Sequence, residues 1–139
     1  MEPSWETIDH TADVGVRVRA PTLSLLFSTA ARAMYSLCLD PDRIEPARSD
    51  TISLPADGLD ELLLDWLREI LARLAADRVV YARFEFGRLD ERGLEAAAAG
   101  EPLDATKHRH ETELKAVTAH GLSVRPVEGG WEAQVIFDV

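Results

Sequence analysis

The clearest structural signal in the sequence lies at residues Leu59–Ala76, LDELLLDWLREILARLAA. Its apolar side chains recur at three- and four-residue spacing and form one continuous face: Leu59, Leu63, Trp66, Leu67, Ile70, Leu71 and Leu74. Asp57 stands where a helix-capping residue belongs, and the acidic Asp60 and Glu61 suit the positive end of a helix dipole. The pattern predicts an amphipathic helix over Leu59–Ala76.

A second helix is predicted closer to the N-terminus. Apolar residues again recur at helical spacing, at Leu23, Leu26, Phe27, Ala30, Met34 and Leu37. Thr22 can cap the first turn and Asp40-Pro41-Asp42 ends the pattern, so we expect a helix from about Thr22 to Leu39. The only cysteine, Cys38, lies in this segment, where we expect a small core side chain in a reducing, cytosolic setting.

Alternation of apolar and polar residues predicts several strands around these helices. It is regular over Asp13–Ala20, where Val14, Val16 and Val18 alternate with Gly15, Arg17 and Arg19. Further strands are expected at 51–54, at 80–86 with 94–99 as a hairpin, at 114–120, and at 122–127 with 131–139 as a hairpin around Glu128-Gly129-Gly130. The chain is predicted to be one α+β domain over residues 1–139, with largely antiparallel sheets packed on two helices. Strand order does not follow from the pattern.

Composition narrows the functional classes. A chain of 139 residues, 46% of them hydrophobic, has the size and apolar content of one domain. The net charge of -10 opposes binding to a polyphosphate backbone, so no direct nucleic-acid binding is expected of the protein alone. No segment has the length of a membrane span. We therefore expect a cytoplasmic protein without a membrane partner, and its oligomeric state stays open.

Acidic groups stand at two strand ends. Asp13 begins one predicted strand, while Asp138 and the carboxylate of Val139 end another. If these strands are neighbours, three negative groups converge and repel one another unless a cation neutralises them. Calcium and magnesium prefer such oxygen ligands. The residues alone leave a second interpretation open, in which Asp138 merely ends a strand and the terminus frays in solvent.

The remaining polar residues do not form a recognisable catalytic set. Cys38 stands alone and His108 and His110 would face opposite sides of a strand, so a zinc site is not expected. Lys115 and His120 lie five positions apart, which on a regular strand also gives opposite faces. Neither a nucleophile elbow nor a phosphate-binding loop occurs in the sequence.

Five segments, taken in order, resemble the archease family. They are His10-Thr11-Ala12-Asp13-Val14-Gly15, Leu63-Leu64-Asp65-Trp66-Leu67, Gly100-Glu101-Pro102-Leu103-Asp104 followed by His108, Lys115-Ala116-Val117-Thr118 with His120, and Val135-Ile136-Phe137-Asp138-Val139. The resemblance runs from about residue 5 to the end of the chain. One departure is Ala119, where the family commonly has an aromatic residue.

The resemblance implies a specific role. Archeases assist the RtcB-type RNA ligase of tRNA splicing and RNA repair, which uses GTP and manganese, by promoting its guanylylation and multiple turnover. It implies a ligase activator that is not itself an enzyme. The implied metal ligands are Asp13, Asp138 and Val139, with calcium as the first candidate and magnesium or manganese as alternatives. Lys115 matches a residue tied to activation, and His10 and His120 are candidate partner contacts.

Two other functions are compatible with the residues. One is a metal-dependent hydrolase of small phosphorylated molecules, in which carboxylate-held ions would act as Lewis acids. It would need turnover without a partner, and no nucleophile or base is evident near Asp13. The other is a chaperone or modulator of RNA-processing enzymes that acts by binding alone, which the change Asp13→Asn, to an uncharged side chain, would spare.

Overall fold

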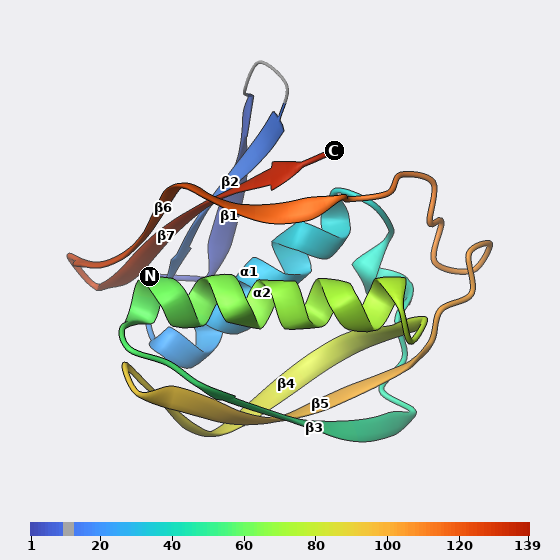
Figure 1. Cartoon of the computed structure of the whole chain (residues 1–139), viewed down its shortest axis with the longest axis horizontal. Coiled ribbons are helices and arrows are strands. Elements are labelled where there is room, and N and C mark those ends of the chain that lie inside the picture. Colours follow the sequence, from blue (N-terminus) through green and yellow to red (C-terminus); the bar gives the residue numbers. More distant parts are fainter. Residues whose placement is uncertain (10–12) are drawn as a thin grey trace.

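The computed structural model describes residues 1–9 and 13–139, and it places two helices between two antiparallel sheets (Figure 1). The elements are β1 (Ser4–Asp9), β2 (Asp13–Ala20), α1 (Leu23–Ser36), the short 3₁₀ helix η1 (Pro41–Arg43), β3 (Arg48–Pro55), α2 (Leu59–Ala75), β4 (Val79–Asp90), β5 (Gly93–Pro102), β6 (Ala116–Val127) and β7 (Gly130–Asp138). The four-stranded sheet has the order β1-β2-β7-β6 and the three-stranded sheet the order β3-β5-β4. The predicted α+β class is confirmed.

The helices begin and end close to the predicted residues. Thr22 caps α1 as expected, since its Oγ1 accepts a hydrogen bond from Leu25 N at 3.2 Å. This helix ends at Ser36, earlier than predicted, because the amides of Cys38 and Leu39 both bond to Tyr35 O in a tightened last turn. The expected cap at Asp57 is wrong for α2. Gly58 precedes that helix with φ 114°, a conformation that favours glycine.

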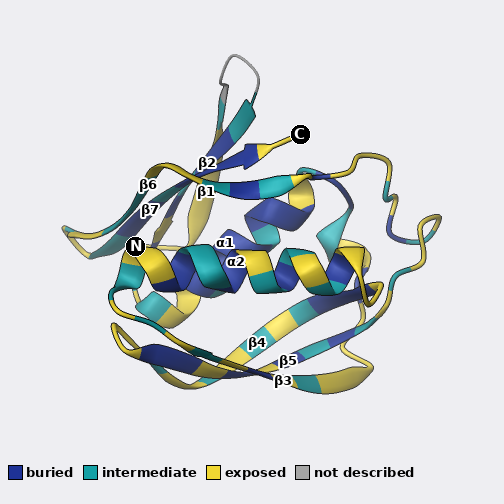
Figure 2. Cartoon of the chain, viewed as in Figure 1, coloured by how far each residue is buried: buried dark blue, intermediate teal, exposed yellow. Residues whose placement is uncertain are grey.

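Trp66 joins the layers of the core. Its side chain is completely buried, and its indole Nε1 donates to Phe27 O of α1 at 3.0 Å. The centroid of its ring lies 4.9 Å from the ring centroid of Phe84 and 5.2 Å from that of Phe86, both on β4. Buried and exposed residues alternate along both helices, as their amphipathic sequences require (Figure 2). Cys38 is also buried, as predicted, and burial raises the pKa of its thiol to about 11.

The strands differ from the prediction in three respects. Strand β1 was not predicted, because this edge strand is exposed along most of its length and carries polar residues on both faces. Strands β3, β4 and β5 are longer than predicted. The separate strands expected at 114–120 and 122–127 are one strand, β6, which pairs with β7 on both sides of an irregularity. No helix in the described ranges is long and apolar enough to cross a membrane.

Candidate functional site

The register of β2 and β7 brings the two strand ends of the predicted site together. Asp13 lies directly opposite Asp138, and the next outward-facing pair is Gly15 with Ile136. Between them Val14 and Phe137 face the core. Side chains opposed in this way have Cβ atoms about 4.5–5.5 Å apart. Asp13 and Asp138 therefore share one end and one face of the four-stranded sheet, the arrangement that a shared cation requires.

Two more of the predicted residues belong to the same end. Lys115 N donates to Asp138 O at 2.9 Å, and Val139 follows Asp138 with 45% of its surface exposed. The Lys115 side chain is exposed. We call Asp13, Lys115, Asp138 and Val139 the acidic tip. The predicted partner contact His10 lies outside the described residues.

The acidic tip offers the oxygen ligands that a hard divalent cation prefers. Two carboxylates and the main-chain oxygen of Val139 supply oxygen ligands, whereas calcium takes about 6–8 and magnesium needs a full octahedron. Within residues 1–9 and 13–139, no three His, Cys, Asp or Glu side chains gather closely enough to hold an ion. The residues fit one part of a coordination shell, and water or a partner would have to supply the rest.

A hollow adjoins the acidic tip on the same face of the sheet. Its volume is about 410 Å³. The six residues that line it are Ile8, Gly15, His120, Gly121, Gln134 and Ile136. We call it the outer hollow. It forms where β6 leaves the ladder, since Thr118 pairs with Ile136 and Ser123 with Gln134, five steps along β6 against two along β7. His120 lies in this departing segment, so the irregularity, which the spacing argument could not include, brings it to the outward face.

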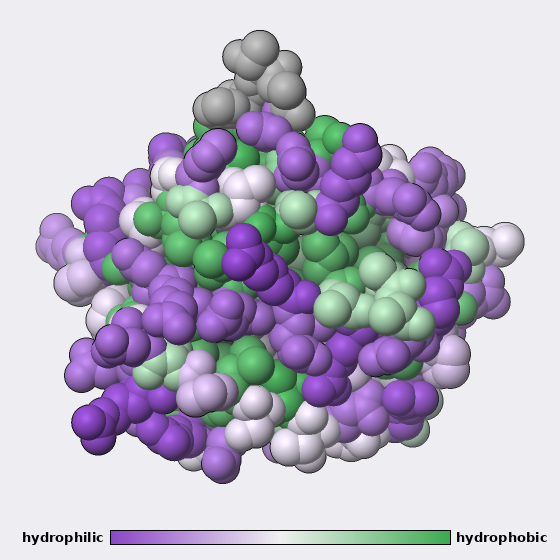
Figure 3. All heavy atoms as spheres, in the orientation of Figure 1, coloured by the Kyte–Doolittle hydropathy of each residue, from purple (hydrophilic) through white to green (hydrophobic). Residues whose placement is uncertain are grey.

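Farther from the tip, the outward face of the sheet carries arginines that are paired with carboxylates. Arg19 Nε lies 2.7 Å from Glu132 Oε2, and Arg125 bonds to the other oxygen of that carboxylate at 2.5 Å. The hydrogen bonds from Arg19 and Arg125 lower the pKa of Glu132. On the view in Figure 3, hydrophilic residues surround several small apolar areas.

A buried polar cluster fixes the chain that leads to Lys115. His108 has no exposed surface; its Nδ1 accepts from Asp104 N at 3.0 Å, and its Nε2 lies 2.9 Å from Glu101 Oε2. Because Nδ1 accepts a hydrogen bond, Nε2 is the ring nitrogen that can donate to the Glu101 carboxylate. Lys107 Nζ bonds to both oxygens of Glu101 at 2.8 and 2.9 Å. The cluster anchors the loop between β5 and β6.

Glu101 should make the free energy of unfolding depend on pH in the acidic range. Burial alone would raise its pKa, but hydrogen bonds from Lys107, the Glu45 amide and His108 outweigh this and lower the pKa to about 2. A carboxyl whose pKa is lower in the folded state stabilises it above the unfolded value, near 4.5, and that contribution is lost as pH falls toward 2. We expect Glu101→Gln to lower the free energy of unfolding at pH 7 by about 2–3 kcal/mol and to flatten its dependence between these pH values.

Urea unfolding of both proteins across this pH range tests the expectation. Glu95→Gln, at an exposed carboxylate of the same strand, is the matched control and should behave as the wild type. Wild-type stability in Glu101→Gln at pH 7 would contradict the proposed anchoring role.

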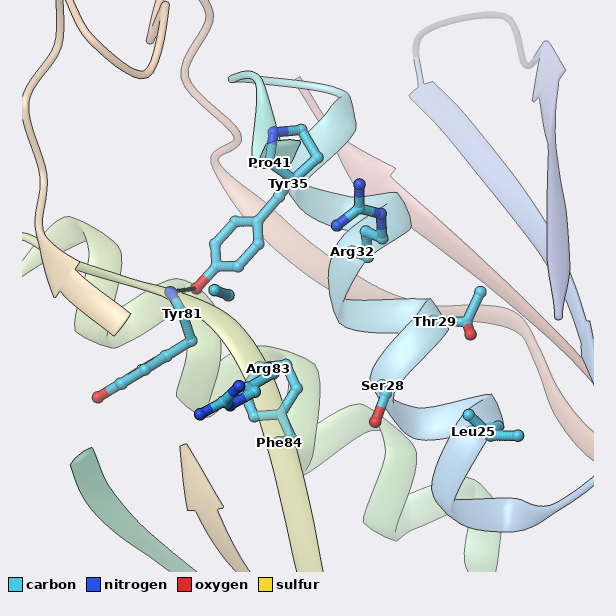
Figure 4. Close-up of a pocket in the computed structure, with 10 residues that line it drawn as sticks. Leu25, Ser28, Thr29, Arg32, Tyr35, Pro41, Tyr81, Arg83 and Phe84 are labelled. Atoms are coloured by element: carbon cyan, nitrogen blue, oxygen red, sulfur yellow. Dashed lines mark hydrogen bonds between the residues drawn. The ribbon is translucent and has the colours of Figure 1, made fainter. Parts of the chain in front are cut away.

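A second hollow, between α1 and β4, contains none of the predicted site residues (Figure 4). Its volume is about 270 Å³, and Arg32 and Arg83 approach it from the two elements. Tyr35 closes its inner end by accepting a hydrogen bond from Tyr81 N at 3.0 Å. Arg32 is paired with Asp42, so one of the two arginines that line this hollow is already neutralised.

Comparison with known proteins now identifies the family. The model of the Archease protein family matches residues 5–139. The chain belongs to the archease family. It is 40% identical to the archease of Methanopyrus kandleri, over 97% of this chain and 99% of that one. It is 33% identical to the archease of Methanosarcina mazei, over 97% and 95%.

Solved structures of archease relatives share the fold. Protein 1598 of Methanobacterium thermoautotrophicum, determined in solution, superposes with a TM-score of 0.77 at 30% identity and covers 97% of this chain and 98% of its own. A Thermotoga maritima protein described as an archease and possible chaperone gives a TM-score of 0.63 over 96% of each chain. At 17% identity, the second comparison concerns the fold alone.

The archease motifs also account for the outer hollow, although sequence reasoning did not find it. Gly15 ends the first motif, His120 belongs to the fourth and Gly121 follows it, and the pairing of β2, β7 and β6 brings them together. A glycine inside an alternating strand was the available signal. The family departure at Ala119 lies at an exposed position of the segment that leaves the ladder. It therefore changes the surface and leaves the core unchanged.

Proposed function

We propose that this archease is a cation-dependent accessory protein that activates an RtcB-type RNA ligase in tRNA splicing and RNA repair. It would promote guanylylation and multiple turnover of the ligase without joining RNA itself. The observation that carries the proposal is the placement of Asp13 opposite Asp138 at one accessible end of the sheet. A cytoplasmic site of action accords with a lone cysteine held as a buried free thiol.

The incomplete shell at the acidic tip favours an activator over an independent enzyme. Asp13, Asp138 and the Val139 oxygen would hold a cation, which would supply charge neutralisation for phosphate groups when bound. Calcium is the first candidate, with magnesium or manganese as alternatives. A cation held by few protein ligands keeps open positions for donors from a partner. We infer that the tip docks at the ligase active site, where the partner completes the shell.

Lys115 and the overall charge would assist docking. The Lys115 amide holds the Asp138 carbonyl while its side chain is exposed beside the tip, where it can reach a phosphate or an acidic group of the partner. A net charge of -10 complements a basic RNA-binding surface and speeds encounter. A lower rate of association in high salt is the expected signature.

The proposal predicts stimulation of ligation that depends on the tip. We expect the wild type to raise multiple-turnover joining of a 3′-phosphate RNA by a cognate RtcB-type ligase, with GTP and manganese, at least about tenfold. Asp13→Asn should lose this stimulation because it removes a charged cation ligand. Product formation over time with substoichiometric ligase is the measurement.

The other outcomes point elsewhere. Equal stimulation by wild type and Asp13→Asn would favour a chaperone that acts by binding alone. No stimulation by either would refute the activator role. Hydrolysis of small phosphorylated substrates without the ligase would instead support a metal-dependent hydrolase.

A further inference from the structure

We infer that the outer hollow binds the base of a purine nucleotide whose phosphates are held through a divalent cation at the acidic tip. The inference rests on the proposed cation site, and it adds a ligand and a second group of residues to it. It requires that nucleotide and cation bind together. Three features of the hollow carry it: its floor, its rim and its distance from Asp13 and Asp138.

The floor of the hollow is apolar and low. Ile8 and Ile136 flank Gly15, and the two isoleucines leave space above the glycine. The backbone does not require glycine here: an added Cβ would lie 3.4 Å from Val135 O and 3.5 Å from the nearest atoms of Ile8 and Ile136, which is ordinary contact. A glycine that strand geometry does not need often marks a close approach by a ligand.

The rim adds polar groups at fixed positions. Gln134 Nε2 donates to Gly121 O at 3.1 Å, and its Oε1 accepts from Arg17 at 3.2 Å, which leaves one amide N–H available. His120 is exposed at the rim, and within the described ranges no hydrogen bond reaches its imidazole. A flat ring with acceptors on its edge would use the floor, the imidazole and the amide, whereas an aliphatic side chain would use only the floor.

The spacing between hollow and tip fits a nucleotide. Gly15 and Ile136 are each two residues from Asp13 and Asp138 on the same face, a separation of about 7 Å. A ribose spans a comparable distance between base and phosphate. Asp13 and Asp138 would repel the phosphates unless a cation bridges them, so nucleotide binding must depend on the metal. The volume of about 410 Å³ lies within the range of small-molecule sites.

Titration calorimetry of the isolated protein tests the inference. Magnesium chloride, calcium chloride and manganese chloride are titrated first, and then ATP or GTP is added to the metal-loaded protein, with inorganic triphosphate as the phosphate-only probe. We expect purine nucleotide binding that weakens at least tenfold without metal and exceeds that of triphosphate at least tenfold. His120→Ala should weaken nucleotide binding several-fold and leave metal binding unchanged.

Variants at glycines separate the hollow from the tip. Gly15→Leu should abolish nucleotide binding and leave metal affinity unchanged. Gly15→Ala, which the strand accommodates without strain, should weaken nucleotide binding and also leave metal affinity unchanged. Gly87→Leu is the matched control, because Gly87 lies on β4 in the other sheet and an added Cβ there meets no atom within 4 Å. This variant should bind both ligands as the wild type does.

The outcomes that overturn the inference are distinct from those that refute the proposed function. Metal binding and ligase stimulation without nucleotide binding would overturn the inference and leave the activator role standing. If inorganic triphosphate binds as tightly as ATP, the base does not contribute to binding and does not occupy the hollow. If Gly15→Leu prevents ligase docking while the wild type binds no nucleotide, the hollow belongs to a side chain of the partner.

Discussion

Replacing Asp138 with asparagine should weaken binding of a divalent cation at least about 100-fold, because even partners that only orient a ligand typically cost about 10–100-fold when removed. The amide keeps the size of the side chain and loses its charge. The bond from Lys115 N to Asp138 O is a main-chain interaction, so the pairing of β6 with β7 should survive. Calorimetric titration with calcium, magnesium and manganese, together with the unfolding temperature, measures both quantities.

Glu128→Gln provides the matched control for this variant. Glu128 is exposed in the turn between β6 and β7, at the opposite end of β7 from Asp138, and its change removes the same single charge. It should retain wild-type metal affinity. If both variants weaken metal binding equally, the effect comes from net charge and the acidic tip is not a site. If neither does, Asp138 is not a ligand.

The second large effect concerns stability. Trp66→Ala should lower the free energy of unfolding by about 3–5 kcal/mol, the usual cost of emptying a large aromatic site in a core. The change would also remove the donor to Phe27 O and the contacts with Phe84 and Phe86, which join α1, α2 and β4. Denaturant unfolding at fixed pH is the measurement.

Trp66→Phe divides this cost into its parts. Phenylalanine keeps most of the aromatic contact and lacks the indole N–H, so a loss of about 1–3 kcal/mol is expected from the missing hydrogen bond to the Phe27 carbonyl and from the smaller ring. Both variants should retain metal binding while folded, because Trp66 lies in the helical layer away from the acidic tip. A loss below about 1 kcal/mol in Trp66→Ala would contradict its role in joining the layers.

The fold was predictable wherever one face of an element is buried. Both helices and β2 have a buried face, and their periodicity gave the correct element types and nearly correct bounds. Strand β1 was missed because an exposed edge strand needs no apolar face. The strand order was also not predictable, because it depends on pairing between distant segments such as β2 and β7.

The candidate site was predictable at its ends and not between them. Asp13 and Asp138 could be predicted because each is an acidic residue at the end of a segment whose apolar pattern predicts a strand. The outer hollow depends on an irregularity of β6 that lets five residue steps oppose two on β7. Regular alternation assigns His120 to a face by counting, and an insertion in the ladder invalidates the count.

The position of β7 between β2 and β6 means that the acidic tip forms only after β7 has entered the sheet. During synthesis β2 emerges early, but Asp13 has no Asp138 beside it until the last strand has entered the sheet. A nascent or truncated chain without β7 lacks both the pair of carboxylates, Asp13 and Asp138, and one wall of the outer hollow. Such a fragment should therefore bind a divalent cation more weakly than the chain that contains β7.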